Sequence, residues 1–111
     1  GDIIGVAVDL DNNKLYFAKN NTWQNSGVPT SGATGTGAMS IGAASSTSPG
    51  YYLAGITSNT GSASANNGNF GNPPYTNTSD AADENGYGKF EYAPPTGYLA
   101  ICTKNLGSDG G

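Results

Sequence analysis

The chain has no histidine, no arginine and a single cysteine, Cys102. One cysteine excludes an internal disulfide. A catalytic thiol or hydroxyl needs a neighbouring base, and histidine is the usual one. We therefore interpret Cys102 as a hydrophobic structural residue. We predict that the chain is not an enzyme and carries no cofactor.

Charged residues are also scarce. They make up 11% of the 111 residues, the net charge is −4, and Lys14, Lys19, Lys89 and Lys104 are scattered. Nucleic-acid binding depends on clustered Lys and Arg side chains, so we expect no nucleic-acid partner. No apolar run approaches the roughly 20 residues of a membrane-spanning helix, so we expect no membrane partner. The abundance of Asn, Ser, Thr and Gly is typical of secreted and virion surface proteins.

Large apolar side chains are the third shortage. Leu, Ile, Val and Phe together number 16 of 111 residues, below the roughly 20% at which disorder becomes an option. Disorder usually requires a high net charge as well, and the seven Tyr and one Trp favour a folded chain. The length fits a single domain. We expect a lean core that is incomplete without a neighbouring chain.

The clearest structural signal is a β-hairpin at the start of the chain. Val6, Val8 and Leu10 alternate with smaller residues, the pattern of a strand with one buried face. The residues Asp-Asn-Asn after Leu10 suit a tight reversal, and the alternation resumes at Leu15. The sequence predicts strands at about 2–10 and 14–20.

Further strands are predicted later in the chain, at 51–58, more weakly at 61–71, and at 98–103. Short strands separated by Gly- and Asn-rich turns predict an all-β protein, most simply an antiparallel β-sandwich. We assign residues 1–106 to one module and 107–111 to a linker-like tail.

Two long polar segments interrupt these strands. For residues 22–49 we expect Trp23 and Ile41 to hold the two ends, with the middle at the surface. The second segment covers residues 72–88, within which the sequence DAADEN could form one helical turn.

Three stretches resemble one known family. The stretch GDIIGVAVDLDNNKLYFAKN is similar to the central hairpin of the SPRY family, and GNFGNPPY (68–75) resembles its late Asn-Phe-Gly motif. The ending FEYAPPTGYLAICTKNL is similar to the tail that follows SPRY-like modules in tailed-phage virion proteins. The family's N-terminal strands have no counterpart here. The chain therefore resembles the C-terminal half of such a module, either part of a larger SPRY-like region or completed by a partner.

The resemblance implies a concanavalin-like β-sandwich in which Phe70 plugs a corner of the core. It also implies a structural or adhesion module of a bacteriophage virion, in the capsid surface or the tail, that acts through loop-mediated protein or glycan binding. Its expected partners are other virion chains, including copies of itself. The alternatives are a host-receptor or carbohydrate-binding tip and a cellular SPRY-type interaction adaptor.

Several loop residues suit a sugar, because a pyranose presents both C–H faces and hydroxyl groups. Aromatic rings can stack on the former, and amide or carboxylate groups can bond the latter. The candidate ligand-binding residues are Trp23, Tyr51, Tyr75, Tyr87, Asn77 and Asp80.

Two groups of acidic residues call for separate interpretations. Asp9, Asp11 and Asn13 have the spacing that opens a calcium loop, but no Glu follows at the required position, so turn formation explains them better. The other group, in which Asp83 and Glu84 follow Asp80, lies in a polar loop. We interpret it as solvated rather than as a glycosidase pair.

Overall fold

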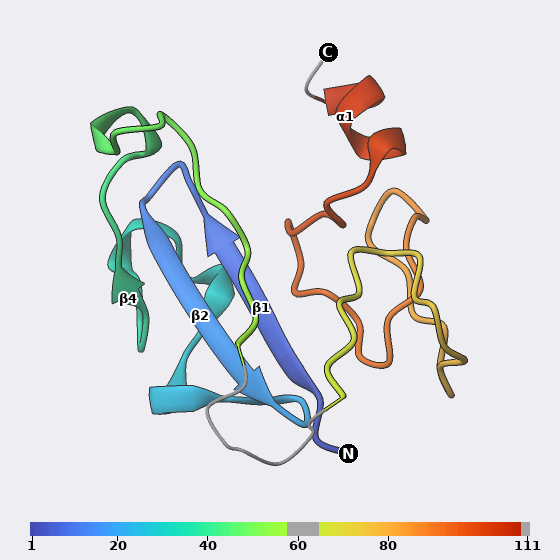
Figure 1. The fold of residues 1–111 in the computed structure, drawn as a ribbon. Helices are drawn as coiled ribbons and strands as arrows, with labels where there is room; N and C mark the ends of the chain where they lie inside the picture. Colours follow the sequence, from blue (N-terminus) through green and yellow to red (C-terminus); the bar gives the residue numbers. More distant parts are fainter. Residues whose placement is uncertain (58–64, 110–111) are drawn as a thin grey trace.

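The predicted hairpin forms the centre of the molecule (Figure 1). In the computed structural model, which describes residues 1–57 and 65–109, β1 (Ile4–Asp9) pairs antiparallel with β2 (Lys14–Lys19). The register runs from Ile4 opposite Lys19 to Asp9 opposite Lys14. At the turn, the Asp9 carboxylate accepts hydrogen bonds from the Asn12 backbone and side chain, and Asn13 adopts φ 56°. The hairpin prediction is confirmed, with slightly shorter strands.

Two short strands complete a small antiparallel sheet. Next to β2 lie β3 (Thr22–Trp23) and, at its other end, β4 (Met39–Ser40), in the order β1-β2-β3 with β4 also on β2. The second sheet of the predicted sandwich is absent from the described part of the chain. The remaining elements are three short 3₁₀ turns, η1 (Gln24–Ser26), η2 (Pro29–Thr34) and η3 (Ala44–Ser46), and one helix, α1 (Thr103–Asp109).

The sheet buries the opposite face from the one predicted. Ala7, Tyr16 and Ala18 are the buried residues of the hairpin, whereas Val6 is 56% exposed and Val8 and Leu10 are also exposed. The reason is steric. The strand positions with small side chains allow the following loop to lie close to the sheet, and that loop covers their face.

The covering loop is organised around Tyr16, which is only 2% exposed. Its ring meets Trp23 edge-on at a centroid distance of 6.4 Å, and its hydroxyl lies 3.3 Å from Ser31 Oγ. A Cβ at Gly37 would lie 2.4 Å from the Asn25 carbonyl oxygen, and Gly37 has φ 67°. Only glycine permits this close approach without strain.

The two ends of this loop are held as expected. Trp23 pairs with Ala18 in the ladder between β2 and β3. The Ile41 N–H donates to the Asn13 carbonyl at 3.0 Å. The two predicted anchors of the 22–49 segment are therefore in place, but the expectation that its middle lies at the surface is wrong at Pro29, which is buried.

The later strand predictions are wrong where the structure describes them. Residues 51–57 and 65–71 form no strand, and residues 58–64 lie outside the described residues. The stretch 98–103 turns into α1 instead of forming a strand, and α1 includes residues 107–109 of the predicted tail. DAADEN forms no helical turn, because Ala81 instead makes an isolated antiparallel bridge with Phe90.

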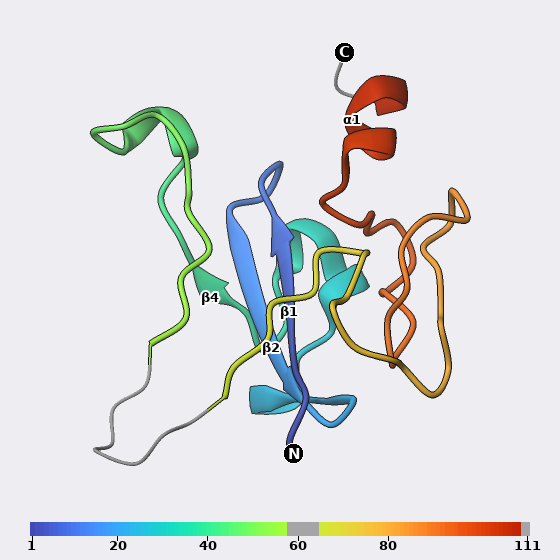
Figure 2. The same ribbon diagram turned by 45° about the vertical axis from the view of Figure 1, so that its right-hand side comes forward.

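Residues 68–109 form a separate body of loops, here called the C-terminal lobe, beside the sheet (Figures 1 and 2). The Tyr98 hydroxyl donates to the Pro29 carbonyl at 2.9 Å and so ties the lobe to the loop that covers Tyr16. Burial raises the pKa of Tyr98 to about 12, and the charge of nearby Asp9 contributes to this rise.

Removing the Tyr16 ring tests the covered face. We expect Tyr16→Ala to lower the free energy of unfolding by about 3–5 kcal/mol, the usual range for losing a buried aromatic side chain. Urea denaturation followed by Trp23 fluorescence measures the change. Tyr51→Ala is the matched control because Tyr51 is exposed, and it should change stability by less than about 0.5 kcal/mol. Equal effects of the two substitutions would contradict the assignment.

Alkaline titration tests the attachment of the lobe. The pKa of Tyr98 in the folded protein is raised above its ordinary value of 10.0. The protonated hydroxyl therefore contributes fully to the free energy of unfolding below pH 10.0, and this contribution is lost as the pH rises toward about 12. We expect NMR signals of Pro29 and Tyr98 to change together over that interval. In Tyr98→Phe the Pro29 signals should no longer change over that interval; if they still change, the hydroxyl does not have this role.

Candidate functional site

The C-terminal lobe is built around a buried carboxylate. Asp83 is 8% exposed, and its Oδ1 accepts the backbone N–H groups of Asn85 at 3.0 Å and Tyr87 at 2.8 Å. Its Oδ2 accepts the Ala100 N–H at 2.8 Å and the Asn105 side-chain amide at 2.7 Å. One side chain thus joins the turn at residues 83–87, the segment that precedes α1, and α1 itself. The prediction that Asp83 belongs to a solvated acidic cluster is wrong.

The same hydrogen bonds determine the ionisation of this carboxyl group. Burial alone raises the pKa of Asp83, but hydrogen bonds led by that from the Ala100 N–H stabilise the charged form more. The net result is a pKa below the ordinary value of 3.8. Asp83 therefore remains ionised at neutral pH and keeps its four acceptor positions.

Asn105 completes this arrangement. It is 5% exposed, and its side-chain amide donates to the Ala100 carbonyl at 2.8 Å as well as to Asp83. Its Oδ1 accepts from the Asn85 side chain at 2.9 Å. Nothing in the spacing of the sequence pointed to Asn105. The Asp-Glu-Asn-Gly run at 83–86 was a readable signal for the turn, since Asp commonly bonds the backbone two residues on.

Close backbone contacts hold the lobe's segments together. A Cβ at Gly71 would lie 3.2 Å from the Cα of Gly88, and one at Gly88 would lie 2.5 Å from the Phe90 ring. Both glycines have positive φ, 115° and 87°. Gly71 therefore lies at a tight corner of the backbone that a larger residue would strain. Phe70 itself is 51% exposed, so the expectation that its ring plugs the core is wrong. The groups that lie closest to Gly71 at that corner belong to Gly88, Ala100 and Cys102.

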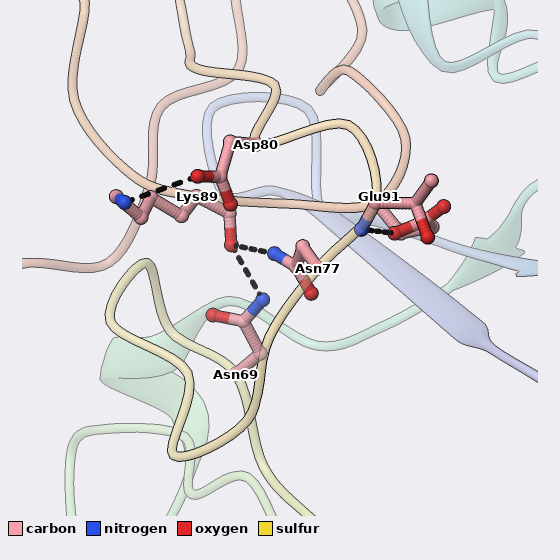
Figure 3. A network of polar contacts seen from close by, with 6 residues as sticks. Asn69, Asn77, Asp80, Lys89 and Glu91 are labelled. Atoms are coloured by element: carbon pink, nitrogen blue, oxygen red, sulfur yellow. Dashed lines mark hydrogen bonds and ion pairs between the residues drawn. The ribbon is translucent and has the colours of Figure 1, made fainter.

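A surface network of polar side chains is attached to this framework (Figure 3). The Lys89 carbonyl accepts the side-chain amides of Asn69 at 2.8 Å and Asn77 at 2.7 Å. The Lys89 ammonium pairs with the Asp80 carboxylate at 3.0 Å. The Glu91 carboxylate accepts the Thr78 N–H at 2.7 Å. Residues 77–80 are thus held along the 89–91 segment.

This network borders a small hollow of about 240 Å³. Its lining includes Tyr75, Asn77, Asp80 and Lys89, and the Tyr75 side chain is exposed. The hollow is smaller than the roughly 300–1,000 Å³ of sites that enclose drug-sized ligands. Its lining brings an aromatic side chain together with charged and amide groups.

A larger, shallow hollow of about 610 Å³ adjoins the first and shares Asn72 and Lys89 with it. Tyr87 and Phe70 contribute aromatic surface there. The Lys104 ammonium lies 5.2 Å from the centre of the Tyr87 ring, within cation–π range. Four of the six predicted ligand-binding residues, Tyr75, Asn77, Asp80 and Tyr87, therefore line two adjoining hollows.

The other two candidates lie elsewhere. Trp23 is half-buried against Tyr16 on the covered face of the sheet. Tyr51 is exposed at the start of the extended 51–57 segment. Neither lines the hollows of the C-terminal lobe.

The weak calcium candidates are engaged in the hairpin turn. Both Asp9 oxygens accept hydrogen bonds from Asn12, which hold the pKa of the Asp9 carboxyl below its ordinary value. The Asn13 carbonyl accepts the Ile41 N–H. Asp11 is exposed. Among the described residues, no group of three or more His, Cys, Asp or Glu side chains gathers in a way that could hold a metal ion.

Comparison with known proteins gave no relative. No protein-family model, no curated protein and no solved structure matches the chain. Within residues 1–57 and 65–109, no helix has the length and apolar character needed to cross a membrane.

Acid titration tests the central role of Asp83. Because the pKa of Asp83 is lowered in the folded protein, its contribution to the free energy of unfolding is complete above the ordinary value of 3.8 and is lost as pH falls through the lower folded-state value. We expect NMR signals of Tyr87 and Ala100 to lose their native positions over that acidic range. We also expect Asp83→Asn to release them at neutral pH, because its amide would face the donors now bound to one oxygen. Asp80→Asn, at an exposed position, is the control and should leave both signals in place.

Proposed function

We propose that the chain is a non-enzymatic adhesion and structural module on the surface of a bacteriophage virion, and that it recognises carbohydrate through its C-terminal lobe. Two lines of reasoning support this proposal. The first is the resemblance of the hairpin, of GNFGNPPY and of the ending to SPRY-like modules of tailed phages. The second is the chemistry gathered around the smaller hollow.

The observation that carries the proposal is the meeting of Tyr75, Asn77, Asp80 and Lys89 at that hollow. An exposed tyrosine ring offers a flat apolar surface for the C–H face of a pyranose. The lysine and the carboxylate beside it offer a donor and acceptors for hydroxyl groups. A neutral sugar satisfies both requirements at once, whereas a strongly charged ligand would be attracted by one partner of the ion pair and repelled by the other.

The hollow is also held in shape before any ligand arrives. Asn69 and Asn77 both bond the Lys89 carbonyl, and the ion pair between Lys89 and Asp80 connects the same two segments. Binding groups that are already positioned lose less conformational entropy on binding. Such preorganisation suits a module that recognises a weakly interacting ligand such as a sugar.

The same proposal includes a specific assignment of the fold. We interpret the four-stranded sheet as one layer of an SPRY-like, concanavalin-like sandwich whose second layer comes from outside the described residues. The support is the exposure of Ile4, Val6 and Phe17 on one face of the sheet, since antiparallel sheets normally pack one face on a core.

Glycan-array screening followed by calorimetry tests the binding site. We expect binding to at least one neutral saccharide, and we expect Tyr75→Ala to weaken it about tenfold, the effect of losing about 1.4 kcal/mol of ring contact. Lys89→Met should weaken it as well, because it removes the hydroxyl donor and leaves Asp80 without its ion pair.

Tyr92→Ala is the matched control, since Tyr92 is an exposed tyrosine that lines neither hollow. It should leave the affinity unchanged. A folded wild-type chain that binds no saccharide, or one whose affinity is insensitive to Tyr75→Ala, would overturn the proposed site.

A further inference from the structure

Two asparagines in the chain are followed by glycine, Asn67 and Asn85. In such a pair the backbone nitrogen of the glycine can attack the side-chain carbonyl carbon of the asparagine, because glycine has no Cβ to block the approach. Both asparagines are exposed, so neither the local sequence nor access to solvent distinguishes them. Hydrogen bonding does distinguish them.

The pair Asn85–Gly86 is held at both of its reacting groups. The Gly86 N–H donates to the Asp83 carbonyl at 3.0 Å, and the Asn85 side-chain amide donates to Asn105 Oδ1 at 2.9 Å. The Asn85 N–H also donates to Asp83 Oδ1 at 3.0 Å. For the glycine nitrogen to reach the side-chain carbon, the first two of these bonds must break, and breaking each of them costs free energy. The turn around Asp83 therefore protects this pair.

The pair Asn67–Gly68 has no such restraint. In the part of the chain that the structure describes, no hydrogen bond or ion pair involves the Asn67 side chain or the Gly68 N–H. The next residue, Asn69, is anchored, because its side chain donates to the Lys89 carbonyl at 2.8 Å and accepts the Gly71 N–H at 2.8 Å. The reacting groups of this pair thus lie just outside the anchored part of the lobe.

We infer that Asn67 is a site of spontaneous deamidation and that the identical pair at Asn85 is protected by the folded lobe. A bond forms between the Gly68 nitrogen and the Asn67 side-chain carbonyl carbon. The carbon–nitrogen bond of the side-chain amide breaks, and ammonia leaves with the proton of the Gly68 N–H. Water then opens the resulting succinimide ring at either of its carbonyl groups. The products are aspartate and isoaspartate, and nothing is oxidised or reduced.

The modification changes the border of the larger hollow. Gly68 lines that hollow together with Phe70. Either product places a carboxylate one residue before Gly68 and makes the net charge of −4 one unit more negative. Isoaspartate also adds a methylene group to the backbone at this point. The inference depends on the hydrogen bonds of the two Asn–Gly pairs and not on the saccharide proposal.

Peptide mapping by mass spectrometry tests the inference on the whole 111-residue chain. The folded protein is incubated in a mildly alkaline buffer, and fragment spectra locate the small mass gain that accompanies replacement of an amide by a carboxylate. We expect Asn67 to react about tenfold faster than Asn85 or more, the factor that corresponds to breaking two ordinary hydrogen bonds. In concentrated urea, where the bonds to Asp83 and Asn105 are lost, the two rates should become similar.

Gly68→Ala is the matched variant for this experiment. A Cβ at Gly68 would lie 3.5 Å from the Phe70 ring, an ordinary contact, so the fold should be kept. The added methyl group hinders the attacking nitrogen, and we expect the reaction at Asn67 to slow while that at Asn85 is unchanged.

NMR spectra of the incubated wild-type protein give a second measurement. The signals of Gly68 and Phe70 should change, whereas those of Ala100, which is bonded to Asp83, should stay in place. Equal rates at the two asparagines of the folded chain, or a faster reaction at the second Asn–Gly pair, would overturn the inference. An unreactive first pair in the folded wild-type protein would overturn it as well.

Discussion

The β1–β2 hairpin carries small side chains on one face and large apolar side chains on the other, and this distribution determines the rest of the fold. Gly5, Ala7 and Ala18 share one face with Tyr16, and these small residues allow the 24–37 loop to pack closely over a single large ring. The larger apolar side chains lie on the other face. A chain with few large apolar side chains therefore leaves several of those in its sheet exposed, namely Ile4, Val6, Val8 and Phe17.

The C-terminal lobe is stabilised in a different way, because it consists mainly of loops and has little regular secondary structure. It does so with a buried carboxylate that accepts four hydrogen bonds and with Asn105, which uses its donors and its acceptor. Among the described residues, every buried side-chain nitrogen or oxygen has a hydrogen-bond partner, as stable buried polar groups require. This framework fixes the segments from which Tyr75, Asp80 and Lys89 project.

The hollows lined by Tyr75 and Tyr87 belong to the C-terminal lobe, whereas the side chains of Ile4, Val6 and Phe17 are exposed on the sheet. Tyr98 links these two parts of the molecule through the covered side of the sheet, where its hydroxyl donates to the Pro29 carbonyl.

The sequence by itself determined the hairpin, its Asp-Asn-Asn turn and the grouping of Tyr75, Asn77 and Asp80, because these depend on residues close together in the chain. Alternation could show that one face of β1 differs from the other. It could not show which face is covered, since that depends on the approach of a loop more than ten residues away. The strand predicted at 98–103 failed for the same reason. The bonds that direct Ala100 and Asn105 come from Asp83, about twenty residues earlier, and only the tertiary structure brings them together.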